Sequence, residues 1–119
     1  MNDTFSIANK TRSPVPKGTG SFKAMKEAVL GKKYELSVVF AGKARMQKLN
    51  KAFRNKNRPT NVLSFPLNKN AGEIFLCPSY TKGETVGFLL IHGLLHLKGL
   101  RHGSTMERKE RKFRNQFGV

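Results

Sequence analysis

Apolar and polar residues alternate strictly over residues 34–40 (YELSVVF), with an apolar side chain at every even position. Side chains of a strand point to opposite faces in turn, so this pattern predicts a β-strand with one buried face. A weaker alternation at residues 5–7 predicts an edge strand. Further short strands are predicted over residues 61–65 and 73–77, each followed by a proline.

Four other segments carry apolar residues three or four positions apart, the spacing that places them on one face of a helix. They predict helices between Ser21 and Gly31 and over residues 43–54, 86–97 and 104–117. In the second helix the apolar face consists of Met46, Leu49 and Phe53, whereas the third helix is apolar nearly all round and should be buried. Two capping boxes are predicted to start the last two helices, Thr81 with Glu84 and Ser104 with Glu107.

The order strand, helix, strand over residues 34–65 predicts parallel pairing of these two strands around a crossover helix.

A length of 119 residues suits one domain, which we expect to span residues 1–119. The longest apolar run, residues 86–97, is interrupted by two histidines and is shorter than the about 18–20 residues of a membrane span. The N-terminus has no signal-peptide pattern, and Cys77 is the single cysteine, which fits a reducing compartment.

Charge narrows the expected partners. Lysine and arginine total 23 residues and aspartate and glutamate total 7, which gives a formal net charge of +16. This excess is larger than solubility requires. Nucleic acid is the expected partner, because basic side chains that contact phosphates release counterions and so drive binding.

The three histidines of the chain, His92, His96 and His102, all lie in the eleven-residue segment HGLLHLKGLRH. The first two would lie one above the other on a helix, and Gly99 would end that helix so that His102 could reach the same point. Three imidazoles suit zinc and leave a fourth coordination position open, as in catalytic zinc sites. Other divalent transition metals also accept imidazole. The alternative is a buried histidine pair with an unrelated surface histidine.

The segment matches the metalloprotease pattern HExxHxxGxxH except at Gly93, where that pattern has the glutamate that serves as general base. This difference argues against peptide hydrolysis, and it suggests that the glycine makes room beside the metal or for a neighbouring segment. Other carboxylates near the histidines in sequence are scarce. Glu84 is expected to cap a helix, and Glu73 is a candidate for an acid that orients a metal ligand.

A basic loop follows the predicted helix at residues 43–54. Arg54, Lys56 and Arg58 precede Pro59. A guanidinium near a metal is what phosphoryl chemistry needs, because it neutralises charge that develops on the phosphorus oxygens. Composition alone favours an ordinary exposed basic loop.

Two separate motifs, HGLLHLKGLRH and PTNVLSFP, resemble the YbeY family of bacterial ribosomal RNA maturation factors, which are metal-dependent endoribonucleases. The resemblance covers about residues 34–113. It implies an α+β fold with a small mixed sheet of about four strands, about four helices and a zincin-like metal helix. It also implies zinc held by His92, His96 and His102, a catalytic role for Arg54, and action on single-stranded RNA in the cytoplasm, in ribosomal RNA maturation and ribosome quality control.

The sequence departs from the family motifs at two positions. Asn61 replaces the aspartate of PTDVLSFP, and Leu100 with Arg101 replace the tyrosine and aspartate of HGYDH.

Our first hypothesis is a zinc-dependent endoribonuclease in which a metal-bound water attacks an RNA phosphodiester and Arg54 stabilises charge. Lys56, Arg58 and the basic C-terminal helix would hold the RNA strand. The second is a non-catalytic zinc-stapled protein that binds ribosomal RNA or a ribosome-associated partner. A metalloprotease is the third.

Overall fold

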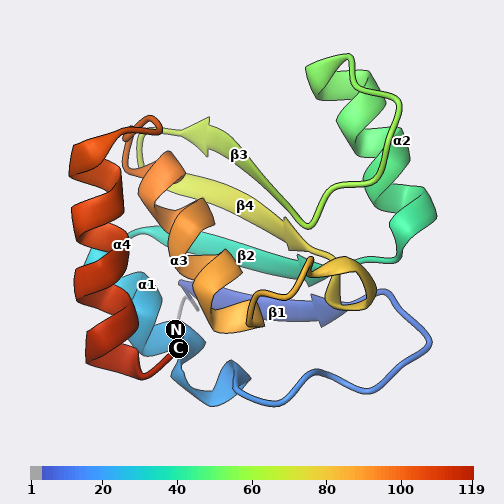
Figure 1. Cartoon of the computed structure of the whole chain (residues 1–119). Coiled ribbons are helices and arrows are strands. Elements are labelled where there is room, and N and C mark those ends of the chain that lie inside the picture. The colour runs from blue at the N-terminus through green and yellow to red at the C-terminus, as the bar shows by residue number, and fades with distance from the viewer. Residues whose placement is uncertain (1–3) are drawn as a thin grey trace.

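A four-stranded mixed sheet forms the centre of the computed structural model, which describes residues 4–119 (Figure 1). Its strands lie in the order β1-β2-β4-β3. Strands β1, β2 and β4 are parallel to one another, and β3 runs antiparallel to β4 at one edge. The bounds are Phe5–Asn9 for β1, Glu35–Phe40 for β2, Val62–Asn68 for β3 and Ala71–Leu76 for β4.

The strand pairing differs from the prediction in one respect. We expected the strand at residues 34–40 to pair in parallel with the strand at residues 61–65, but β2 pairs with β4 and β3 is not its neighbour. Strand β3 turns back on β4 through the two residues 69–70, and this tight hairpin sets the antiparallel pair. Pro66 lies inside β3 instead of ending it, which an edge strand tolerates.

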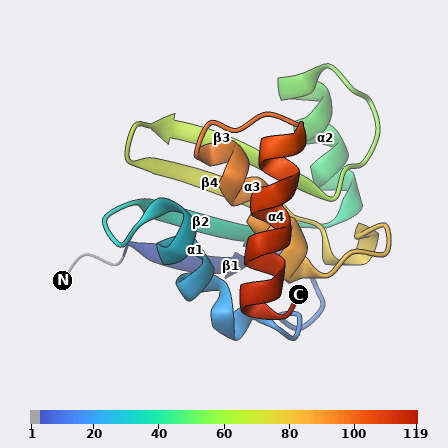
Figure 2. The same ribbon diagram turned by 60° about the vertical axis from the view of Figure 1, so that its left-hand side comes forward.

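Three helices cover one face of the sheet and one helix covers the other (Figures 1 and 2). Helices α1, α3 and α4 contribute to the larger core, whereas α2 contributes to the smaller one. The bounds are Phe22–Leu30 for α1, Lys43–Arg54 for α2, Val86–Leu97 for α3 and Ser104–Phe117 for α4, with short 3-10 turns at Thr19–Ser21 and Pro78–Tyr80. The predicted α+β class, with four strands and four α-helices in residues 4–119, is confirmed.

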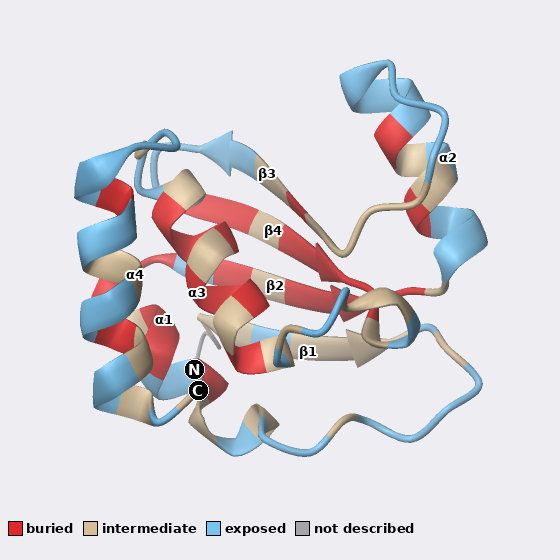
Figure 3. Cartoon of the chain, in the orientation of Figure 1, coloured by how far each residue is buried: buried red, intermediate tan, exposed pale blue. Residues whose placement is uncertain are grey.

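The alternation of strand residues explains why there are two cores. Phe40 and Ile74 point to α1, α3 and α4, whereas Val39 and Phe75 point to α2. Figure 3 shows the central strands β2 and β4 and much of α3 buried, the edge strands β1 and β3 mostly intermediate or exposed, and much of α2 exposed. Met46, on the predicted apolar face of α2, is buried in the smaller core, whereas Phe53, in the last turn of the helix, is 67% exposed.

The helix that carries two of the histidines starts differently from the sequence prediction. Thr85 is the N-cap of α3, and its hydroxyl accepts a hydrogen bond from the Phe88 amide at 3.0 Å. The predicted capping box of Thr81 and Glu84 is therefore wrong by one turn. The second predicted box is also wrong, because Gly103 is the N-cap of α4 and makes no side-chain cap.

None of the helices in residues 4–119 has the length and apolar character that crossing a bilayer requires.

Helix α3 packs close to the sheet because Gly93 has no side chain. A Cβ at this position would lie 2.9 Å from Ser64 Oγ and 3.1 Å from Ile74 Cδ1. The Ser64 hydroxyl of β3 also donates a hydrogen bond to the Gly93 carbonyl at 3.0 Å. The glycine therefore makes room for a neighbouring segment, which fixes the depth at which the histidine helix lies on the sheet.

We predict that Gly93→Ala lowers the free energy of unfolding by about 1 kcal/mol, because overpacking against Ile74 outweighs the helix propensity gained. Urea unfolding followed by circular dichroism measures the change. Ile74→Val shortens the obstructing side chain, so the double variant should lose less stability than the sum of the two single variants. A Gly93→Ala protein more stable than the native one would contradict the close-packing argument.

Candidate metal centre

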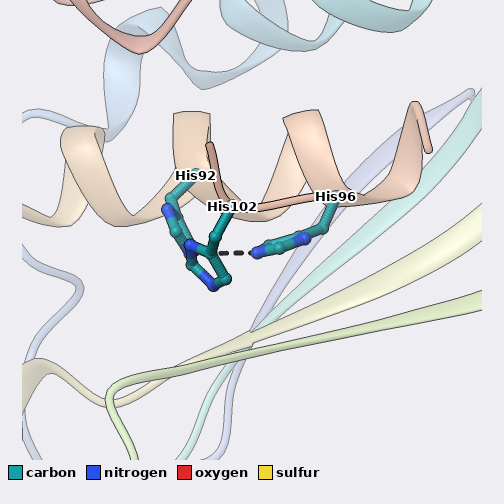
Figure 4. Close-up of side chains that lie close together, drawn as sticks. All are labelled: His92, His96 and His102. Carbon is teal, nitrogen blue, oxygen red and sulfur yellow. Dashed lines mark hydrogen bonds between the residues drawn. The ribbon is translucent and has the colours of Figure 1, made fainter. Parts of the chain in front are cut away.

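The three histidine side chains converge on one side of α3 (Figure 4). His92 and His96 lie one turn apart on the helix, and their ring centroids are 4.6 Å apart. The ring of His102 lies 5.1 Å from that of His92 and 4.9 Å from that of His96. One nitrogen from each ring can be chosen so that the three atoms lie within 4.8 Å of one another, which is close enough for one ion to contact all three.

A Schellman turn at the end of α3 brings the third histidine back. The Leu100 amide donates to the Leu95 carbonyl at 3.0 Å, and the Gly99 amide donates to the His96 carbonyl at 2.9 Å. This pattern needs a left-handed residue at its centre, and Gly99 has φ +98°. The predicted reversal at Gly99 is present, and it places His102 beside the helix that it follows.

Hydrogen bonds on the outer side of the rings fix the tautomers of two histidines. His96 Nδ1 lies 3.1 Å from the Leu100 carbonyl, which can only accept, so this nitrogen carries the hydrogen. His92 Nδ1 lies 3.1 Å from Glu110 Oε2, and an ionised carboxylate also only accepts. Both neutral rings therefore present an unprotonated Nε2, which is the form that binds a metal.

These tautomers leave two lone pairs facing each other. His92 Nε2 and His96 Nε2 are 3.1 Å apart, a distance at which a hydrogen bond would need a hydrogen on one of them (Figure 4). Burial, followed by the charges of His92 and His102, lowers the pKa of His96, so a second proton on this ring is disfavoured. With both rings neutral the arrangement is repulsive, and a proton on His92 Nε2 or a metal cation between the nitrogens makes it favourable.

The donor set fits zinc. Zinc–imidazole bonds of about 2.0–2.1 Å in tetrahedral geometry put two nitrogens about 3.3 Å apart, close to the 3.1 Å between the Nε2 atoms of His92 and His96. All three candidate ligands are neutral nitrogen donors, which zinc shares with other divalent transition metals. His102 is exposed, so the site is open to solvent on that side.

A cleft of about 670 Å³ connects the histidines to the C-terminal end of α2. Strand β3 forms its floor, and Arg54 lies in its wall together with Phe53. The structure thus brings Arg54 and the three histidines to one cleft, although they are separated by about forty residues in the sequence. Lys56 and Arg58 are exposed on the following loop and do not line the cleft. The Arg58 carbonyl is held by the side chain of the buried Asn50 at 2.9 Å.

The acids considered from the sequence lie elsewhere. Glu73 shares the face of β4 with Phe75, opposite to Ile74 and α3, so it does not orient a histidine. Glu84 precedes α3 by two residues, more than two turns from His92. None of the residues that line the cleft is acidic. Position 93 faces the sheet, so a glutamate there would have to displace Ser64 and Ile74.

The two departures from the family motifs have different surroundings. The Asn61 side-chain amide donates to the Thr81 carbonyl at 3.2 Å, and the backbone carbonyl of Asn61 accepts from the Cys77 amide at 3.0 Å. An aspartate has no hydrogen for the first of these bonds, so the amide ties the start of β3 to the loop before α3. Arg101 is exposed in the turn before His102.

Sequence reasoning missed Glu110, the carboxylate that contacts His92. Its position carries a signal in retrospect. Met106 and Phe113 mark the buried stripe of α4, and Glu110 lies four residues after the first and three before the second. A carboxylate inside an apolar stripe needs a partner, because burial without one is costly. With its side chain 14% exposed, Glu110 finds that partner in the ring of His92.

Comparisons with known proteins show the family of the chain. The family model described as Endoribonuclease YbeY matches residues 18–118. A protein of Ehrlichia ruminantium named Endoribonuclease YbeY is 38% identical over 104 residues, which cover 71% of this chain and 66% of the relative. Proteins of the same name from Rubrobacter xylanophilus and Staphylococcus carnosus are 41% and 32% identical, over 64% and 73% of this chain and 58% and 71% of their own lengths. The chain thus spans about two thirds or less of the length of most of these relatives.

The fold is also similar to a solved structure. The solution structure of TM1509 from Thermotoga maritima matches with a TM-score of 0.59 and 27% identity, over 95% of this chain and 88% of that chain. The family match, over residues 18–118, includes Arg54, strand β3 and all three histidines. On this evidence, the chain belongs to the YbeY family.

Proposed function

We propose that this protein is a zinc-dependent endoribonuclease that cleaves single-stranded RNA in the maturation of ribosomal RNA and in ribosome quality control, in the cytoplasm. Membership of the YbeY family supports the reaction class. The observation that carries the metal dependence is the pair of Nε2 atoms 3.1 Å apart, which the Nδ1 hydrogen bonds leave without a hydrogen when the rings are neutral, with His102 beside them. We take residues 1–119 as one domain.

In this proposal His92, His96 and His102 hold the zinc ion. Bound zinc supplies a Lewis acid and lowers the pKa of a water molecule toward neutrality, which is the chemistry that hydrolysis of a phosphodiester requires. Glu110 and the Leu100 carbonyl hold the rings of His92 and His96 in the tautomers that leave Nε2 free. The residues lining the cleft include no acid, so none of their side chains is a carboxylate base.

Arg54 supplies the positive charge in the cleft wall. It lies in the same cleft as the histidines, where its guanidinium can donate to phosphate oxygens as negative charge develops on them. Lys56 and Arg58 follow on the exposed loop. In this proposal they contact the RNA strand as it leaves the cleft. The basic residues of α4 extend the surface available to RNA.

A second candidate function is a non-catalytic protein that binds ribosomal RNA or a ribosome-associated partner, with zinc as a structural clip. Asn61 and Arg101 favour this second function, because each stands where the family motif has a carboxylate. None of the residues that line the cleft is acidic. Tight binding of single-stranded RNA without metal-dependent cleavage would support this candidate over the first.

The first prediction concerns metal content. We expect about one zinc ion per chain in untagged native protein, and loss of that zinc in His102→Ala, because two remaining ligands hold the ion weakly. Elemental analysis by mass spectrometry measures the stoichiometry. Arg101→Ala is the matched control, since it changes the neighbouring exposed residue without removing a ligand. Equal zinc in His102→Ala and native protein would contradict the three-histidine site.

A further prediction concerns Glu110. Replacing it by leucine removes the acceptor for His92 Nδ1, and we expect zinc affinity to fall about 10- to 100-fold. Glu110→Gln keeps an acceptor oxygen without the charge and should lose less. Chelator competition measures both affinities, and Glu107→Gln, an exposed acid on the same helix, is the control. Native affinity in Glu110→Leu would show that the carboxylate does not orient the ligand.

The cleavage prediction concerns Arg54. Arg54→Ala should retain zinc and cleave a single-stranded RNA about 10²–10³-fold more slowly, the range for removing one group that stabilises developing charge. Gel analysis of an end-labelled RNA measures the rate, and Lys17→Ala controls for loss of one positive charge elsewhere. His96→Ala provides the background. If the metal-replete native protein cleaves no faster than His96→Ala, the proposed activity is wrong.

A further inference from the structure

Phe53 has an environment unlike that of the other phenylalanines. The chain has nine, all within residues 4–119, and Phe53 is the one whose side chain is largely exposed, at 67%. It lies in the last turn of α2, directly before Arg54, and lines the same cleft as the three histidines. An exposed aromatic ring in the wall of a cleft offers apolar surface to whatever enters that cleft.

Two other rings hold Phe53 in place. Its centroid lies 5.0 Å from that of Phe65, with the planes at 63°, an edge-to-face contact. Phe65 in turn lies 5.6 Å from Phe75 at 81°. Because Phe75 is 8% exposed and belongs to the smaller core, the three rings form a continuous path from the core to the cleft. The exposed ring is therefore supported from below and loses little freedom when a ligand packs on it.

The charge around the ring selects the class of ligand. Residues 43–58 contain seven lysines and arginines and no acid: Lys43, Arg45, Lys48, Lys51, Arg54, Lys56 and Arg58. This stretch comprises α2 and the exposed loop after it. A polyanion with planar, stackable groups matches a cationic segment that presents one exposed ring, and single-stranded nucleic acid is that ligand because its bases are free to stack.

We propose that Phe53, supported by Phe65, is a stacking platform for one nucleobase of a single-stranded RNA bound in the cleft. The assignment rests on the proposed function for its choice of RNA, and it adds the way in which the strand is held. Stacking tolerates every base, because each base has a π-face, so the platform positions a nucleotide next to the metal site without reading its identity.

Binding to an uncleavable strand tests the platform apart from catalysis. The probe is a fluorescein-labelled 2′-O-methyl oligoribonucleotide of ten residues, and its partner is the same backbone with abasic residues. We expect Phe53→Ala to weaken binding of the first probe about tenfold and to leave the second unchanged. The dependence of binding on salt should also stay unchanged, because no phosphate contact is lost. Leu67→Ala, an exposed apolar residue of β3 outside the cleft, is the matched control.

A spectroscopic readout complements the binding constants. The chain has no tryptophan, so Phe53→Trp introduces a single indole whose fluorescence reports stacking directly. We expect the base-containing probe to quench it and the abasic probe to leave it unchanged, with affinity at least as high as that of the native protein. Circular dichroism of each variant checks that the fold is retained, as the exposure of Phe53 leads us to expect.

The outcomes separate this inference from the proposed function. Native affinity in Phe53→Ala, or quenching by the abasic strand, overturns the platform and leaves the cleavage experiment untouched. Quenching by a glutamate decapeptide but not by RNA would also overturn it, in favour of an acidic peptide. Conversely, a tenfold loss in Phe53→Ala together with no metal-dependent cleavage supports the platform and contradicts the nuclease.

Discussion

Two imidazole Nε2 atoms held 3.1 Å apart, each on a ring whose Nδ1 already has a hydrogen-bond partner, are the constraint on which the rest of this site depends. Neither ring can relieve the repulsion by changing tautomer, because Glu110 and the Leu100 carbonyl both require a hydrogen on the opposite nitrogen. The hydrogen bonds of the two Nδ1 atoms thus determine whether the Nε2 atoms are free to bind a metal. A cation resolves the conflict, and His102 completes a donor set of neutral nitrogens around it.

Packing determines where this donor set lies. Gly93 lets α3 approach β3 and β4, and the Ser64 hydroxyl fixes that approach through the Gly93 carbonyl. The same strand forms the floor of the cleft that leads to Arg54 and Phe53. The glycine that separates this chain from the metalloprotease pattern is therefore a packing residue, since its missing side chain would point to the sheet and not to the cleft.

Much of this arrangement was predictable from the sequence, and the exceptions have a common cause. The histidines, Gly99 and the strand at residues 34–40 were found because their signals are local: spacing along one helix, a left-handed turn, and alternation. The partner of β2 was mispredicted because pairing order depends on contacts across the sheet. The exposure of Phe53 was not predictable because helical periodicity gives the face of a residue and not what that face packs against. Glu110 was missed because its partner, His92, lies on another helix, and local spacing does not show contacts between helices.

The Schellman turn has a consequence for what the ion contributes to the fold. The candidate ligands span positions 92–102, so a metal bridging them closes only short loops, which restrict an unfolded chain less than long ones do. Cross-links of this kind contribute little to global stability through chain entropy. None of the three histidines is among the buried residues of the two cores on the sheet. Under the proposed function, a cell short of zinc would therefore keep a folded reservoir of the protein that takes up metal again without refolding.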